Sequence, residues 1–65
     1  MVFVLTCKEY DGGFKTFVKQ SKEECIQEVL EWMDPEDDDD AARIRKSLEE
    51  TNEYDCGHVW KIEQK

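Results

Sequence analysis

The sequence predicts an α+β fold of the order ββααβ, in which two helices pack on one face of a three-stranded antiparallel sheet. Three observations support this fold class: a hairpin pattern around two glycines near the N-terminus, an apolar stripe at helical spacing in the middle, and a short alternating segment near the C-terminus. The 65 residues make one domain, residues 1–65, near the lower limit for a stable core. Hydrophobic residues form 38% of the chain, enough to fold although 40% of the residues are charged.

A β-hairpin is expected at the N-terminal end. Residues 2–10 (VFVLTCKEY) are rich in β-branched and aromatic side chains, and residues 14–20 (FKTFVKQ) alternate apolar and polar ones. Gly12 and Gly13 between them can adopt the positive φ angles of a tight turn. The first strand is apolar on both faces, which is typical of a central strand and predicts a partly apolar outer face of the sheet. Val2 and Val4 are expected on that face, and Phe17 is expected on it or at its edge.

The first helix is predicted over residues 22–33. Ser21 followed by Glu24 is the pattern of a capping box, in which the two side chains satisfy backbone N–H groups at the start of a helix. Beyond it, apolar residues recur at helical spacing on one side, and acids lie on the other. The predicted buried stripe consists of Cys25, Ile26, Val29, Leu30, Trp32 and Met33.

A second helix is predicted to begin between Pro35 and Asp40 and to end at about Thr51. Proline disfavours helix at the residue before it, so the first helix ends near Asp34, which is also a good N-cap for the second. The predicted buried face of this helix consists of Ala41, Ile44 and Leu48.

A turn and a third strand are predicted at the C-terminal end. Residues 52–57 include asparagine, aspartate and glycine, which are typical of turns. Residues 58–64 (HVWKIEQ) alternate again, and Trp60 and Ile62 are expected to face the helices.

Negative charge is concentrated in the middle of the chain. The formal net charge is −8, but residues 1–22 carry +2, residues 23–55 carry −11 and residues 56–65 carry +1. Residues 23–40 hold ten acids and no lysine or arginine. Such a field attracts cationic partners and repels nucleic acids and anionic membranes, so we expect neither direct nucleic-acid binding nor membrane binding.

The acidic block is the predicted partner-binding site. Like charges one turn apart destabilise a helix, which favours a functional reason for keeping them, although charge runs are more often plain solvated surface. The predicted site residues are Glu24, Glu28, Glu31, Asp34, Glu36, Asp37, Asp38, Asp39 and Asp40.

No metal or cofactor site is predicted. A calcium-binding EF-hand loop counted from Asp34 would place Asp39 where glycine is required and Arg45 where glutamate is required. The other possible metal ligands lack the spacing of a zinc site. They are Cys7, Cys25, Cys56 and His58.

The protein is not expected to be an enzyme. Nucleophilic catalysis would need Cys7 or Cys56 beside His58, with a carboxylate such as Asp55 to orient the imidazole. Neighbours in sequence on one turn rarely reach that geometry. The chain is also short for a cleft that would separate the pKa values of two carboxylates.

In size, acidic charge and element order, the whole chain resembles small phage-encoded inhibitors, in particular type I anti-CRISPR proteins. The resemblance implies a DNA mimic that occupies the basic groove of a CRISPR effector subunit and blocks the binding of target DNA. The residues that it implies for this contact are Glu24, Glu28, Glu31, Asp34 and the run Glu36–Asp40.

The cytoplasm is the predicted location, that of the host cell if a phage encodes the protein. Three cysteines are an odd number without a framework spacing, so reduced thiols are expected. The first residues, MVFVLT, have no basic leader and too short an apolar run for a signal peptide or membrane span.

Two functions therefore compete. The first is an acidic DNA mimic that binds a basic nucleic-acid-binding surface of a target protein. The second is a small cytosolic adaptor or regulatory module that binds a protein through the apolar face of its sheet, possibly as a dimer. A third and less favoured hypothesis is an acidic domain that binds or buffers metal ions.

Overall fold

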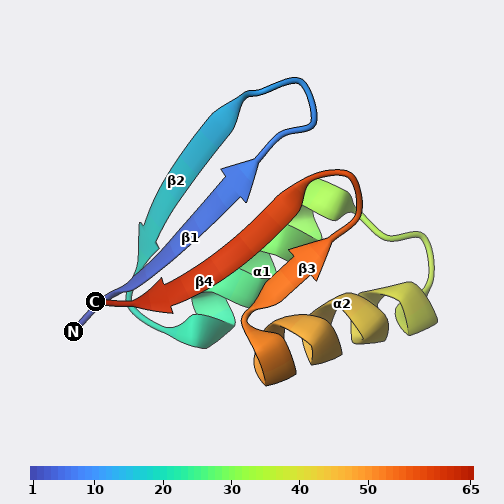
Figure 1. The fold of residues 1–65 in the computed structure, drawn as a ribbon. Helices are drawn as coiled ribbons and strands as arrows, with labels where there is room; N and C mark the ends of the chain where they lie inside the picture. The colour runs from blue at the N-terminus through green and yellow to red at the C-terminus, as the bar shows by residue number, and fades with distance from the viewer.

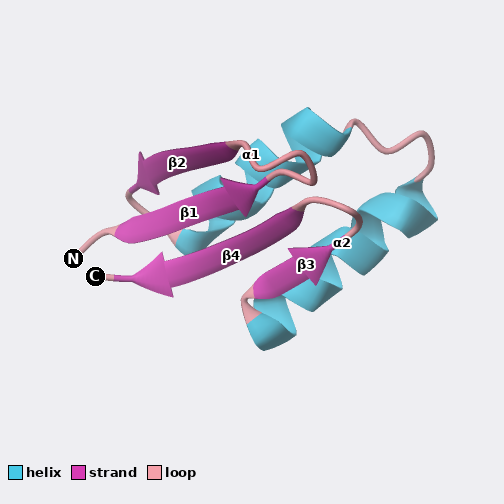
Figure 2. Ribbon diagram, turned by 45° about the horizontal axis from the view of Figure 1, so that its top comes forward, coloured by secondary structure: helices cyan, strands magenta, loops and turns pink.

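The computed structural model describes all residues 1–65, which form one four-stranded sheet and two helices. The elements in chain order are β1 (Phe3–Lys8), β2 (Phe14–Lys19), α1 (Lys22–Met33), α2 (Asp38–Thr51), β3 (Glu53–Asp55) and β4 (Val59–Gln64). The strands are antiparallel in the order β2-β1-β4-β3, and both helices lie on the same side of the sheet (Figures 1 and 2). The α+β class is confirmed, but the prediction of three strands is wrong.

The N-terminal hairpin forms as predicted, with slightly shorter strands. Its turn is closed by the N–H of Glu9, which donates to the carbonyl of Gly13 at 2.7 Å, while Gly12 adopts a φ of 98° that favours glycine. Phe17 lies opposite Leu5 and packs against the core on the helix side. Its expected place on the outer face is therefore wrong, because that face of β2 carries Phe14, Thr16 and Val18 instead.

β3 is the strand that the sequence did not predict. It pairs with β4 through a turn in which Gly57 adopts a φ of 102° and its N–H donates to Asp55 Oδ1 at 3.2 Å. Hydroxyls of Ser47 and Thr51 both donate to the carbonyl of Glu53, at 2.6 and 3.1 Å, which ties the end of α2 to this strand.

The helix boundaries follow from their caps. α1 starts where Ser21 Oγ accepts the N–H of Glu24 at 3.2 Å, so the predicted start and the bounds 22–33 are confirmed. Asp34 does not cap the second helix: it ends the first, with a φ of 44° and an N–H that donates to Leu30. Asp37 is the N-cap of α2, and its Oδ1 accepts the N–H of Asp40 at 2.8 Å.

The core lies between the sheet and the two helices. α1 packs against β1, β2 and β4, whereas α2 packs against β3 and α1 (Figure 1). Trp32 is 50% exposed, so its predicted place in the buried stripe is wrong. Neither helix is long and apolar enough to cross a membrane. The buried residues are Leu5, Cys7, Cys25, Ile26, Val29, Ile44, Leu48, Trp60 and Ile62.

Two valines on opposite sides of the sheet provide a test of this packing. Val29 is 0% exposed in α1, whereas Val18 is 63% exposed on the outer face. We expect Val29→Ala to lower the free energy of unfolding by about 2 kcal/mol, because it removes two buried methyl groups and leaves a cavity. Val18→Ala should lower it by less than about 1 kcal/mol. Urea titration measures both losses, and equal losses would contradict the burial of Val29 in the core.

Candidate functional site

The three acids of α1 that were predicted to face outward have different surroundings. Glu24 and Glu31 are exposed and have no basic partner. Glu28 is half-buried against β2, and its Oε1 lies 2.9 Å from Nζ of Lys19. Its hydrogen bond raises the pKa of Lys19. Two of the three are therefore free to meet a partner, while the third fastens the helix to the sheet.

A groove about 440 Å³ in volume brings three more of the predicted acids together. Asp34 and Glu36 reach it from the segment between the helices, and Asp40 reaches it from the first turn of α2. Arg43 lies 3.8 Å from Asp40, and the side chains of both are mostly exposed. The apolar remainder of the lining is Met33, Pro35, Ile44 and Tyr54.

The other predicted acids lie at the start of α2. Asp37 caps the helix, and Asp38 and Asp39 occupy its first turn with exposed side chains. Carboxylates at a helix N-terminus are each worth about 0.3–1 kcal/mol, because they interact favourably with the helix dipole. This part of the acidic run therefore stabilises the fold as well as adding to the surface charge.

Glu23 links α1 to α2. Its Oε1 lies 2.7 Å from Nη1 of Arg45, and Gln27 donates to its other oxygen at 2.9 Å. The hydrogen bond from Arg45 lowers the pKa of Glu23 from its ordinary 4.5 to about 2. Lys22 adds a second link, because its ammonium donates to the carbonyl of Glu49 at 2.9 Å.

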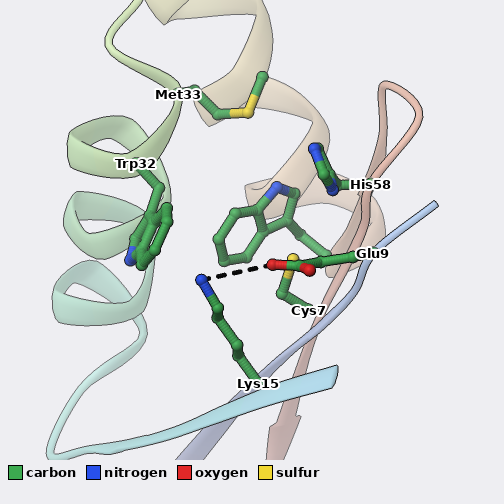
Figure 3. Close-up of a pocket in the computed structure, with 7 residues that line it drawn as sticks. Cys7, Glu9, Lys15, Trp32, Met33 and His58 are labelled. Atoms are coloured by element: carbon green, nitrogen blue, oxygen red, sulfur yellow. Dashed lines mark ion pairs between the residues drawn. The ribbon is translucent and has the colours of Figure 1, made fainter. Parts of the chain in front are cut away.

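A second hollow, about 250 Å³ in volume, lies between the end of α1 and the inner face of the sheet (Figure 3). Three of its residues share one cross-strand row, since Cys7 pairs with Lys15 on one side and with Trp60 on the other. The lining is Cys7, Glu9, Lys15, Trp32, Met33, His58 and Trp60.

The polar groups of this pocket include one ion pair and one unpaired donor. Lys15 places its ammonium 3.7 Å from the centre of the Trp32 ring and 3.3 Å from Oε1 of Glu9. The indole N–H of Trp60 is buried and has no hydrogen-bond partner within the protein. Burial raises the pKa of Cys7, so this thiol stays protonated at neutral pH and is a poor nucleophile.

The cysteines and the histidine do not assemble into a metal site. Cys7 and Cys25 are buried, and Cys56 is exposed, with its sulfur 3.7 Å from that of Met33. No three groups among the histidine, cysteines and carboxylates are placed to hold a metal ion.

The sequence did not indicate the pocket, because its lining comes from four separate places in the chain. The contact that marks the pocket is the one between the ammonium of Lys15, in a strand, and the ring of Trp32, at the end of the first helix. In the sequence, helical spacing places Trp32 in a buried stripe and strand alternation places Lys15 at a polar position, so nothing indicates that the two side chains meet.

Comparison of the chain with models of protein families, with curated protein sequences and with solved structures finds no match. No relative therefore assigns a role to the acidic surface or to the pocket. The charges, burial and contacts of the residues themselves are the basis for inferring a function.

The lowered pKa of Glu23 predicts a defined loss of stability in acid. A carboxyl whose pKa is lowered on folding contributes stability above its ordinary pKa, and that contribution is lost as the pH falls through the folded value. We expect the stability difference between the native chain and Glu23→Gln to be largest near neutral pH and to shrink from pH 4.5 toward 2.

Glu31→Gln is the matched control, because it removes the same charge from an unpaired residue of the same helix. Its stability relative to the native chain should change little over this range. Urea titration at a series of pH values measures both. If the stability difference between the native chain and Glu23→Gln does not vary with pH, the ion pair between Glu23 and Arg45 does not form in solution.

Proposed function

We propose that this protein binds a basic, nucleic-acid-binding surface of a target protein through its acidic face and prevents nucleic acid from binding there. The observation that supports it best is the groove, where Asp34, Glu36 and Asp40 lie beside apolar side chains. Lysine and arginine combine an apolar stem with a cationic head, which suits such a lining.

The charges around the groove favour a cationic partner further. Glu31, Asp38 and Asp39 are exposed nearby in sequence and have no basic partner. Arg43 is the only cation paired with a groove carboxylate, and exposed pairs of this kind are worth about 0–1 kcal/mol. A partner's lysine or arginine can therefore displace it at little cost.

Nucleic-acid-binding proteins are the class of partner that this chemistry suits, since they present lysine and arginine in rows that match phosphates. The resemblance to anti-CRISPR proteins narrows the proposal to a CRISPR effector subunit as the target. An inhibitor of this kind acts by occupancy and needs no catalytic group.

Neutralising the groove tests the proposal. The test variant is Asp34→Asn/Glu36→Gln/Asp40→Asn. Asp34 has a left-handed backbone conformation, which asparagine also tolerates, so the variant should keep the fold. We expect this variant, when immobilised, to retain far less of the nucleic-acid-binding proteins that the native chain captures from a host-cell lysate. Duplex DNA should release those proteins from the native chain, and uncharged dextran should not.

The matched control is Asp11→Asn/Glu50→Gln/Glu63→Gln, which removes three charges outside the groove. It should retain the captured proteins almost as the native chain does. Equal losses in the two variants would mean that net charge alone, and not the groove, attracts these proteins. Capture that duplex DNA fails to reverse would contradict mimicry.

A second candidate function, binding through the outer face of the sheet, is favoured by one observation. Phe14 is 65% exposed and shares that face of β2 with Val18, on a strand at the edge of the sheet. Lys8 lies between Phe14 and Val59 across the strands, which breaks the apolar surface. This mixed surface supports an adaptor less well than the groove supports a mimic.

Substitution of Phe14 distinguishes the two functions. If the acidic face makes the contact, Phe14→Ser should leave the capture of partner proteins unchanged. High salt should then abolish this capture, because salt screens ion pairs at a surface. If the outer face makes the contact, Phe14→Ser should weaken capture, and salt should not. Capture assays of this variant at low and high salt measure both.

A further inference from the structure

We infer that the pocket at the end of α1 binds a small, neutral, planar molecule that carries a hydrogen-bond acceptor, such as a carbonyl oxygen or a ring nitrogen. This inference is independent of the acidic face, and it rests on three features of the pocket: its unpaired donor, its walls and its charge.

The need for an acceptor comes from Trp60. Its side chain is 2% exposed, it lines the pocket, and its N–H has no partner within the protein. Buried polar groups in folded proteins are nearly always paired. Two other groups of the lining can accept a hydrogen bond, namely the carboxylate of Glu9, which is held by Lys15 at 3.3 Å, and the imidazole of His58. Neither of them accepts the N–H of Trp60. An acceptor on a bound molecule would complete this pairing.

The walls favour a flat and largely apolar body. Trp32 contributes a half-exposed ring from the last turn of α1, and Met33 contributes a flexible thioether that packs well against aromatic rings (Figure 3). The ammonium of Lys15 over the Trp32 ring holds that wall in place. A volume of about 250 Å³ has room for a molecule of one or two rings.

Charge decides between a neutral and an ionic molecule. Lys15 and Glu9 cancel one another within the pocket, so the lining offers no net charge to an ion. The protein as a whole carries −8, which repels an anion. A cation such as an ammonium group would bring further donors and would leave the N–H of Trp60 unpaired. A neutral carbonyl compound satisfies the N–H of Trp60 without either penalty.

Nuclear magnetic resonance with three simple probes tests the inference. The chain has two tryptophans, so its spectrum holds two indole N–H signals, and Trp32→Ala assigns the remaining one to Trp60. Benzamide should move the Trp60 signal to higher frequency, as a new hydrogen bond does. Benzoate, which has acceptors and a charge, should bind more weakly. Toluene, which has no acceptor, should not shift this signal to higher frequency.

Two variants complete the test. Loss of the aromatic wall in Trp32→Ala should weaken benzamide binding by about two- to tenfold, from the usual strength of aromatic contacts. Phe14→Ala removes an exposed aromatic ring from the opposite face of the sheet and should leave binding unchanged. The inference is overturned if benzamide leaves the Trp60 signal in place, if toluene shifts it equally, or if Trp32→Ala binds benzamide as well as the native chain.

Discussion

The packing of α1 on the inner face of the sheet is the interaction on which the rest of this structure depends. Nine buried side chains form the whole core, and three of them, Cys25, Ile26 and Val29, belong to this helix. Polar contacts fasten it on both sides: Glu28 to Lys19 of β2, and Glu23 to Arg45 of α2. Each such pair is weak by itself. Together they fix which face of α1 turns toward solvent, and so where its free acids point.

The acidic segment is more than a surplus of charge, because several of its members have structural roles. Asp34 ends one helix in a left-handed conformation, and Asp37 begins the next by capping it. Acids in the first turn of α2 then interact favourably with its dipole. The repulsion among neighbouring carboxylates is thereby partly offset. A 65-residue domain can carry this charge because much of it lies where backbone N–H groups are otherwise unsatisfied.

The sequence predicted the elements whose signals are local, and it missed those set by contacts distant in the chain. α1 was placed with its bounds, because Ser21, the apolar stripe and Pro35 all act within a few residues. The sequence does not predict β3, because this edge strand has three residues and turns only one side chain, Tyr54, toward the core. Its other residues have the composition of a turn. The groove and the pocket were missed because each gathers residues from several elements.

Both hollows exist because α1 ends at Met33 while the chain turns away toward α2. Past that residue the sheet and the second helix lack a full cover, so one hollow opens toward Trp60 and the other toward Tyr54. Met33 lines both of them. An unbranched thioether side chain readily changes rotamer to fill the space beside it. If the two proposed contacts form, Met33 links them: a molecule in the pocket would restrict the positions of this side chain at the groove, and a cationic side chain in the groove would restrict them at the pocket.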